Sequence, residues 1–302
     1  MVELTNRCNV NCLHCPREFT LGKAMDVGEM EFQFFKAIFD QCYVTLTSIS
    51  LTGLGETLLY RDLFRVTDYV KKKREDLQIS ISINGTLLND EMITRLCGSG
   101  IHTVQISIDG YDQTSFSNIR KNINFGKFTE RVRKLAEEAD RTIDVCANVV
   151  LMRENISELP QFVDFIKKLS IRKINFTPIN LVAVDFEDSY YEIFGDTPFQ
   201  RQVKQLKEKA QKEELTITFY KPVVPCTFPW DAIYITWDGY IVPCCAKPFP
   251  KVLNFGDLHQ QKFEEVVNCP EFRKFREQMI KGNIPPFCEK CHNFYPEIAS
   301  AF

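Results

Sequence analysis

Three cysteines near the start of the chain, Cys8, Cys12 and Cys15, have the types and spacing of metal ligands. Thiolates bind zinc or iron–sulfur clusters in preference to hard cations. A structural zinc ion takes four ligands, and the fourth here would have to be His14 or a distant residue. Three thiolates on a four-iron cluster instead leave one iron open for a substrate or cofactor. The spacing therefore favours an iron–sulfur cluster with one free coordination position.

A second group of cysteines lies near the end of the chain and consists of Cys226, Cys244, Cys288 and Cys291. Apolar alternation around an Asp-Gly turn predicts a β-hairpin at 233–243, and residues 264–282 predict a helix. These elements would bring the four thiols together, where they suit zinc as well as an iron–sulfur cluster. Cys245 directly follows Cys244, and both cannot easily bind the same metal centre.

The elements that must position these cysteines alternate between strands and helices. Runs rich in β-branched residues predict strands at 2–5, 44–52, 77–83, 101–108, 142–150 and 171–179. Apolar residues at helical spacing predict helices at 30–42, 63–76, 127–139 and 157–169. Repeated strand–helix units with short connections favour an α/β fold whose parallel strands form a barrel or partial barrel.

Glycines and polar residues directly follow three of these strands, as GLGE (53–56), Asn84-Gly85 and Asp109-Gly110. Each of these sequences is by itself an ordinary turn. The carboxyl ends of parallel strands meet at one end of a barrel, where active sites of this architecture are built. The three turns and the first cysteines are therefore expected to surround one opening.

Composition limits the partners of the chain. Its 302 residues are 44% hydrophobic and carry a formal net charge of −3, as in an ordinary globular protein. Nothing in this charge favours a nucleic acid or an anionic membrane, and no apolar run is long enough to span a bilayer. The first residues lack the features of a signal peptide, so a cytoplasmic, reducing compartment is expected, where clustered cysteines more often hold metal than form disulfides.

Cys8-x3-Cys12-x2-Cys15 after a first strand resembles the cluster motif of the radical S-adenosylmethionine (SAM) superfamily. In that family the open iron of a [4Fe–4S] cluster binds the amino and carboxylate groups of SAM. The resemblance extends along the following strands and implies SAM contacts at His14, Gly53, Gly55, Glu56, Ser82, Asn84, Ser107, Asp109 and Arg120. Leu54 separates two glycines that are usually adjacent in the family. The expected fold is α/β, an open (β/α)₆ partial barrel of the TIM type.

The C-terminal cysteines resemble the auxiliary-cluster domains of radical SAM enzymes, called SPASM and, in shortened form, twitch. Cys226, Gly239 and Cys244 match their opening pattern, Cys-x(9–15)-Gly-x4-Cys. A full SPASM domain has a further cysteine where this chain has Glu297, so the resemblance is to the twitch form. It implies one auxiliary [4Fe–4S] cluster, held by Cys226, Cys244, Cys288 and Cys291. The expected parts are a barrel at 1–200, a linker at 201–225 and a small hairpin-plus-helix domain at 226–302.

The resemblance also implies an activity. SAM and the N-terminal cluster would generate a 5′-deoxyadenosyl radical, which removes a hydrogen atom from a carbon of the substrate. An auxiliary cluster with four thiolate ligands has no open iron, so it is expected to transfer an electron in a net dehydrogenation. The expected substrate is a small polar molecule of the sugar or aminocyclitol type, as in antibiotic biosynthesis, and the expected electron donor is a flavodoxin or ferredoxin.

Three alternatives stay open on the sequence. Cys245 is a candidate catalytic residue: as a free thiol it would donate a hydrogen atom to the substrate radical, which makes the enzyme an epimerase, or it only packs beside the cluster. Related SPASM enzymes modify ribosomally made peptides, so a peptide substrate is the second alternative. The third is a metal-binding scaffold without SAM chemistry.

Overall fold

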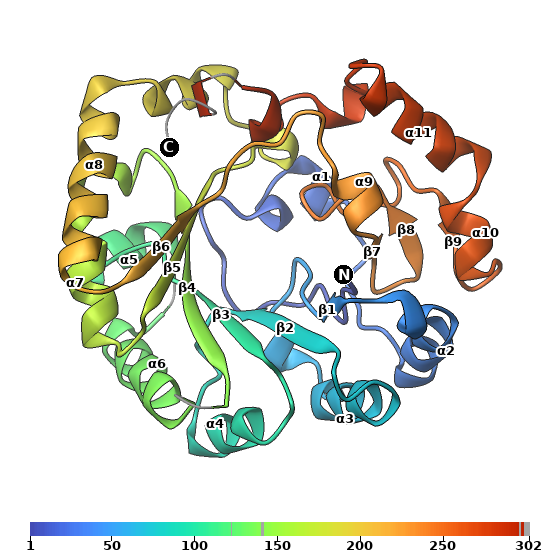
Figure 1. Cartoon of the computed structure of the whole chain (residues 1–302), viewed down its shortest axis with the longest axis horizontal. Coiled ribbons are helices and arrows are strands. Elements are labelled where there is room, and N and C mark those ends of the chain that lie inside the picture. The colour runs from blue at the N-terminus through green and yellow to red at the C-terminus, as the bar shows by residue number, and fades with distance from the viewer. Residues whose placement is uncertain (122, 140–141, 296, 299–302) are drawn as a thin grey trace.

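A curved, six-stranded parallel sheet forms the centre of the computed structural model, which describes all residues except 122, 140–141, 296 and 299–302 (Figure 1). Each strand pairs with the next one along the chain. The strands are β1 (Ser48–Ser50), β2 (Gln78–Ile83), β3 (Thr103–Ser107), β4 (Asp144–Leu151), β5 (Lys173–Pro178) and β6 (Thr216–Phe219). The expected α/β partial barrel of six strands is confirmed.

Helices cover the outer face of this sheet, and the N-terminal segment runs inside its curve (Figure 1). The helices of the barrel are α1 (Thr20–Lys23), α2 (Phe32–Cys42), α3 (Leu63–Lys73), α4 (Asp90–Cys97), α5 (Gln113–Ile119), α6 (Phe125–Glu138), α7 (Pro160–Lys168) and α8 (Thr197–Lys212). Within the described ranges no helix is both long and apolar enough to cross a lipid bilayer.

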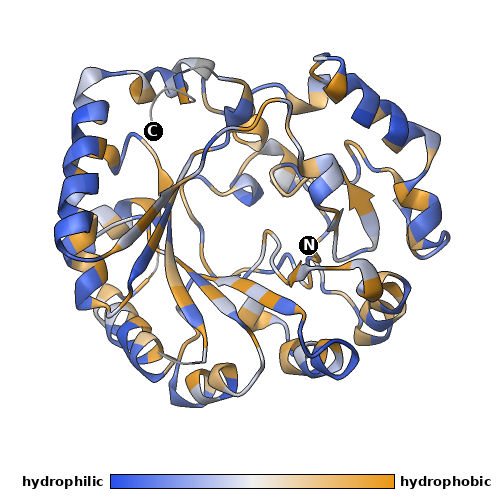
Figure 2. Ribbon diagram, in the orientation of Figure 1, coloured by the Kyte–Doolittle hydropathy of each residue, from blue (hydrophilic) through white to orange (hydrophobic). Residues whose placement is uncertain are grey.

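Strict alternation along the strands gives the sheet two different faces. On β2 the side chains of Ile79, Ile81 and Ile83 are buried under the helices, whereas Ser80 and Ser82 on the inner face are half-buried. Figure 2 shows the same alternation of hydrophobic and polar residues along the central strands. Burial of the apolar face is the main favourable contribution to the fold, and it leaves the inner, polar face free to meet a ligand.

Two sequence expectations need correction. Residues 201–219 are not a linker, because they contain most of α8 and the whole of β6, which pairs with β5 from Lys173–Thr216 to Phe176–Phe219. The alternation of Thr216, Ile217, Thr218 and Phe219 is a strand signal that the predicted boundary at residue 200 overlooked. Residues 2–5 form single bridges instead of a regular strand, because different partners flank them.

The C-terminal part is a small three-stranded antiparallel sheet with helices. Its elements are α9 (Phe228–Asp231), β7 (Tyr234–Ile235), β8 (Tyr240–Val242), β9 (Gly256–Asp257), α10 (Phe263–Val267) and α11 (Pro270–Ile280). The single helix expected at 264–282 is divided, because Pro270 begins a new helix and Sγ of Cys269 accepts a hydrogen bond from its third residue. The expected hairpin is present as β7 and β8.

The N-terminal segment joins this small sheet to the barrel. The amide of Val2 donates to the carbonyl of Ser50 at the end of β1, at 2.8 Å. The next amide, that of Glu3, points the other way and donates to the carbonyl of Ile235 in β7, at 2.9 Å. A single extended segment thus carries the hydrogen bonding of the barrel over to the hairpin, immediately before the first cysteines.

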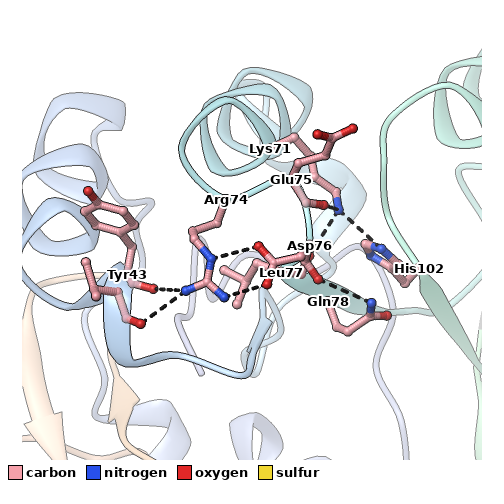
Figure 3. Close-up of polar contacts among 9 residues, drawn as sticks. Tyr43, Lys71, Arg74, Glu75, Asp76, Leu77, Gln78 and His102 are labelled. Carbon is pink, nitrogen blue, oxygen red and sulfur yellow. Dashed lines mark hydrogen bonds and ion pairs between the residues drawn. The ribbon is translucent and has the colours of Figure 1, made fainter.

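The opposite end of the barrel is held by basic side chains at the end of α3 (Figure 3). Nζ of Lys71 donates to the carbonyls of Glu75 and Leu77, at 2.5 and 3.1 Å. Arg74 pairs with the carboxylate of Asp76, at 2.7 and 2.8 Å, and donates to the carbonyl of Tyr43 at 3.1 Å. These contacts satisfy carbonyls between α3 and β2 and the carbonyl of Tyr43 after α2. These basic side chains are therefore structural, and they lie at the end of the barrel away from the cysteines.

Glu3 is the polar centre of the junction between barrel and hairpin. Its side chain is fully buried and accepts hydrogen bonds from the amide of Leu54 (2.8 Å), the amide of Trp237 (3.3 Å) and the hydroxyl of Tyr234 (3.2 Å). Burial raises the pKa of Glu3 from 4.5 to about 7, although these hydrogen bonds oppose the shift. The carboxyl group is therefore protonated in the folded state at pH values where it is ionised in the unfolded chain.

This difference predicts a pH dependence of stability. Between pH 4.5 and 7 the folded state keeps a proton that the unfolded chain has released, so stability falls as the pH rises. A shift of this size corresponds to about 3 kcal/mol. Glu3→Gln, which cannot ionise, is expected to lack this decrease, while losing on the order of 1 kcal/mol at every pH for the missing acceptor.

Anaerobic denaturant unfolding of both proteins from pH 5 to 7.5 checks this expectation, and Glu31→Gln at an exposed position controls for the lost charge. Other titrating groups are common to both proteins and cancel in the difference. Equal pH slopes for the wild type and Glu3→Gln would show that Glu3 is not the responsible group.

Candidate active site

The loop that carries the first three cysteines is held from below by the loop after β1. The amide of Glu56 donates to the carbonyl of Arg7 at 2.8 Å. Gly55 lies so close that a Cβ there would be 2.5 Å from the carbonyl oxygens of Thr5 and Arg7, and a Cβ on Gly53 would be 2.2 Å from Cγ of Glu3. Only glycine permits this approach, which explains the two glycines of GLGE.

Glu56 and Asn84 fix the side of the loop that bears Cys8. The carboxylate of Glu56 accepts from the amides of Leu58 (3.0 Å) and Asn84 (2.6 Å), and burial raises its pKa to about 7. Nδ2 of Asn84 contacts Sγ of Cys8 at 3.8 Å and donates to Oδ1 of Asn9 at 2.9 Å. Glu56 therefore orients the residue that touches the first thiol, and its contact with SAM stays a prediction.

A buried ion pair fixes the other side of the loop. Nε and Nη2 of Arg120 donate to one carboxylate oxygen of Asp109, at 2.8 and 2.7 Å, and both side chains are almost fully buried. Nη1 of Arg120 contacts Sγ of Cys12 at 3.5 Å. Burial opposes the charge of Arg120, but Asp109 and the neighbouring thiols outweigh it and raise the pKa of the guanidinium. The result is a fixed positive charge beside the second thiol.

His14 and the two serines complete the residues expected to bind a cofactor. Nε2 of His14 lies 3.8 Å from the carboxylate of Asp109, and its buried Nδ1 has no hydrogen-bond partner among the described residues. Ser82 and Ser107 stand on the inner face of β2 and β3. The structure thus brings the expected residues of four separate segments to the same end of the barrel, while their individual roles stay predictions.

The C-terminal thiols lie around one apolar cavity. Its wall contains Cys226, Cys244, Cys288 and Cys291, and the rest of the lining consists of apolar side chains such as Phe275, Phe287 and Met279. The four thiols line the wall instead of meeting at a point: among the described residues no three His, Cys, Asp or Glu side chains converge on a single-ion site. Four thiols around one cavity are a ligand set that an iron–sulfur cluster takes, with each thiolate bound to its own iron.

The protonation of these thiols fits a soft metal centre. Burial raises the pKa of Cys12 to about 11 and that of Cys288 to about 12. Both groups therefore remain neutral thiols until a metal displaces their protons, as metal binding to cysteine requires. The apolar lining of the C-terminal cavity offers no competing hard ligand, and thiols make up both groups, so both fit iron–sulfur clusters.

The two cysteine groups face each other across the mouth of the barrel. Cys8 contacts Asn84, which follows β2, and Cys12 contacts Arg120, which pairs with Asp109 after β3. On the other side, Nδ2 of Asn180, just after β5, donates to Sγ of Cys291 at 3.5 Å. The hydroxyl of Tyr220, just after β6, donates to Oδ1 of Asn293 at 2.8 Å. Both groups are thus at the carboxyl ends of the strands, with β4 between them.

Cys245 differs from its neighbour Cys244. Its side chain is exposed, and it is absent from the described lining of the four-thiol cavity. Cys245 therefore lies beside the candidate ligands, near enough to interact electrostatically with Cys226 and Cys291, without lining their cavity.

Two contributors to the site were not found from the sequence. Asn180 follows β5 as Asn84 follows β2. The expectation that polar residues directly after a strand lie at the mouth of the barrel would have identified it. The sequence around Glu3 does not indicate a buried carboxyl group, because a glutamate in a short extended segment is ordinary. Its role is visible only from the three hydrogen-bond donors that the fold brings to it.

Comparisons with known proteins agree with this geometry. The model of the radical SAM superfamily matches residues 2–166. The model of the SPASM iron–sulfur cluster-binding domain matches residues 226–292.

Individual proteins are more distant. A tungsten-containing aldehyde ferredoxin oxidoreductase cofactor-modifying protein of Pyrococcus furiosus is 24% identical over 313 residues, covering 96% of this chain and 86% of that protein. A GTP 3′,8-cyclase of Clostridium botulinum is 28% identical over 260 residues, covering 80% of this chain and 79% of the cyclase.

Two solved structures share the fold. Streptococcus suis SuiB bound to the precursor peptide SuiA matches with a TM-score of 0.72 and 15% identity, over 98% of this chain and 69% of SuiB. BtrN in complex with AdoMet and 2-DOIA matches with a TM-score of 0.61 and 15% identity, over 100% of this chain and 95% of BtrN.

The two thiol groups predict separable losses of metal. Cys8→Ala is expected to lose the N-terminal cluster and Cys288→Ala the C-terminal one, so each variant keeps about half of the iron and sulfide of the wild type. Cys97→Ala, in α4 on the outer face of the barrel, is the matched control and should keep both. Iron and sulfide analysis of anaerobically purified proteins measures this. Full iron content in Cys8→Ala or Cys288→Ala would contradict the assignment of that thiol.

Proposed function

This chain belongs to the radical SAM superfamily, and we propose that it is an oxidoreductase that removes a hydrogen atom from a carbon of a small polar substrate. The family binds SAM and a [4Fe–4S] cluster, and the SPASM domain binds further iron–sulfur centres. The observation that carries the proposal is the placement of two cysteine groups on opposite sides of one barrel mouth. A substrate in the mouth lies between them.

The N-terminal side of the mouth starts the reaction. When bound, SAM and the cluster held by Cys8, Cys12 and Cys15 supply a 5′-deoxyadenosyl radical, the species that takes hydrogen from carbon. Asn84 and Arg120 position the first two thiols, and the positive charge of Arg120 partly offsets the burial that raises the pKa of Cys12. Asp109 holds Arg120 in place, and GLGE packs the cysteine loop against the barrel.

The C-terminal side of the barrel mouth is proposed to hold an electron acceptor. Four thiolates, from Cys226, Cys244, Cys288 and Cys291, would saturate one auxiliary cluster and leave no iron open to substrate. The role proposed for this side is acceptance of the second electron of a dehydrogenation. A small reductase protein such as a flavodoxin or ferredoxin is proposed to supply the first electron.

The size of the substrate is proposed from this chain's own features. BtrN binds AdoMet and 2-DOIA and SuiB binds a precursor peptide, so the shared fold accommodates either kind of ligand. The inner face of the sheet carries small polar side chains such as Ser80 and Ser82, and this supports a small polar molecule. Peptide modification is the alternative that the same fold allows.

One observation favours a second candidate reaction, epimerisation. Cys245 is an exposed thiol next to the four-thiol cavity. Its S–H bond is weak enough to donate a hydrogen atom to a carbon radical, which would return the substrate to its original oxidation state with inverted configuration. The sulfur radical left on Cys245 would be reduced to the thiol by one electron from the auxiliary cluster and one proton from solvent.

SAM cleavage tests the proposed class of reaction. Anaerobic wild-type protein with SAM and dithionite is expected to form 5′-deoxyadenosine, and Cys8→Ala should form none above background. Chromatography of the quenched reaction measures the product. A wild-type preparation that contains both clusters and forms no 5′-deoxyadenosine would overturn the proposal in favour of a metal-binding scaffold.

Deuterium separates the two reactions once a substrate is available. A dehydrogenase forms a product that is two hydrogen atoms poorer and takes no deuterium from heavy water, and Cys245→Ala leaves its turnover within about threefold. An epimerase incorporates one deuterium at the inverted carbon and loses this incorporation in Cys245→Ala. Mass spectrometry of the product distinguishes the two outcomes.

A further inference from the structure

A row of uncharged polar side chains crosses the inner face of the sheet. Its members are Ser82 on β2, Gln105 on β3, Asn148 on β4 and Asn175 on β5. Strand register places Ser82 beside Gln105 and Asn148 beside Asn175. All four side chains are half-buried, so solvent reaches them from the interior of the barrel. Of the four, only Ser82 is among the residues expected to contact SAM.

Hydrogen bonds join neighbouring members of the row. Oε1 of Gln105 accepts from Oγ of Ser82 and from Nδ2 of Asn148, both at 2.9 Å. Oδ1 of Asn148 accepts from Nδ2 of Asn175 at 3.0 Å, and the same nitrogen contacts Sγ of Cys146 at 3.5 Å. These bonds use both lone pairs of the Gln105 oxygen and both hydrogens of the Asn175 nitrogen.

Two amide atoms of the row have no hydrogen-bond partner, and one of them is a donor and the other an acceptor. Among the described residues, Nε2 of Gln105 has no acceptor and Oδ1 of Asn175 has no donor, and neither atom is enclosed. If the oxygen and nitrogen atoms of all three amide groups are exchanged, every hydrogen bond between the amides reverses its direction. The unpaired atom of Gln105 then becomes an acceptor and that of Asn175 a donor. In either direction the row offers a ligand at least one amide donor and one amide acceptor.

The surroundings of the row are almost free of charge. Alternation places only Ser, Thr, Asn, Gln, Cys and Val at the inward positions of the six strands, except Asp144 and Lys173. These two lie at the far ends of β4 and β5 and pair with each other at 2.7 Å. A charged group placed against the row would lose its hydration without a counter-charge, whereas a neutral group would exchange hydrogen bonds with water for those of the row.

We propose that this row is a substrate subsite and that it takes an uncharged group with both donor and acceptor capacity, an amide or hydroxyl group of a small carbohydrate-like molecule. The assignment rests on the function proposed above and names the chemistry of the part of the substrate that enters the barrel. Charged parts stay at the mouth, where Nη1 of Arg17 is buried without a partner among the described residues.

Binding of matched probes tests the subsite. N-acetylglucosamine carries a neutral amide where glucosamine carries an ammonium group. Cluster-loaded wild-type enzyme with SAM is expected to bind N-acetylglucosamine about tenfold more tightly than glucosamine, as measured by saturation-transfer NMR titration under anaerobic conditions. N-acetylglycinamide, a peptide-like amide, shows whether the substrate group that binds the row belongs to a sugar or to a peptide. Tighter binding of this probe than of N-acetylglucosamine would indicate a peptide substrate.

Gln105→Glu provides the decisive variant. One carboxylate oxygen keeps the bonds from Ser82 and Asn148, and the other presents a negative charge to the interior. The preference is therefore expected to reverse, with glucosamine bound about tenfold more tightly than N-acetylglucosamine. A reversal cannot result from misfolding. Gln78→Glu makes the same change at an exposed inward position of β2 outside the row. This control variant should still bind N-acetylglucosamine more tightly than glucosamine, as the wild type does.

Two results would overturn the subsite: an unchanged preference in Gln105→Glu with wild-type iron content, or wild-type enzyme that binds neither neutral probe. Formation of 5′-deoxyadenosine by the same wild-type preparation reports on the proposed function independently. Enzyme that cleaves SAM but fails the probe test retains its proposed function and loses only the subsite.

Discussion

The structure depends on the hydrogen bonding of one short segment, Val2 to Thr5, which lies between the barrel and the C-terminal hairpin. Successive amides of this segment donate in opposite directions, to Ser50 of β1 and to Ile235 of β7. The buried carboxyl group of Glu3 reinforces the junction by binding the loop after β1 and the hairpin together. Because Cys8 follows this segment directly, the same bonds that join the two parts also set the position of the first thiols.

Buried polar groups then give the cysteine loop its shape. A loop cannot fix three thiols through apolar packing alone, because its backbone groups need partners. The amide of Glu56 donates to the carbonyl of Arg7 in this loop, and its carboxylate holds Asn84 against Cys8. The ion pair of Asp109 with Arg120 anchors the side near Cys12. Removing one member of such a buried pair leaves an uncompensated charge. Asp109 and Arg120 therefore hold each other in place beside the cysteine loop. Nη1 of Arg120 is still free to contact the thiol of Cys12.

Two faces of the same sheet perform different tasks. The outward face packs aliphatic side chains under the helices and supplies the burial that stabilises the barrel. The inward face has no need to be apolar, since the barrel is open and solvent reaches it. Its amides, from Gln105 to Asn175, bond to one another and present their remaining capacity to the interior. The arrangement places a neutral binding surface below a mouth that is flanked by thiols.

The sequence by itself determined the alternation of strands and helices, the partial barrel, and both cysteine groups, because period-two patterns and ligand spacing are local properties. It placed the barrel boundary too early and missed β6, since four residues of alternation in an expected linker are a weak local signal. Only the tertiary structure decided that Cys245 lies outside the described lining of the four-thiol cavity and that Glu3 joins two parts more than two hundred residues apart. It also decided that polar side chains from four strands form one row. These features arise from contacts between residues distant in the chain, and spacing along the sequence carries no information about them.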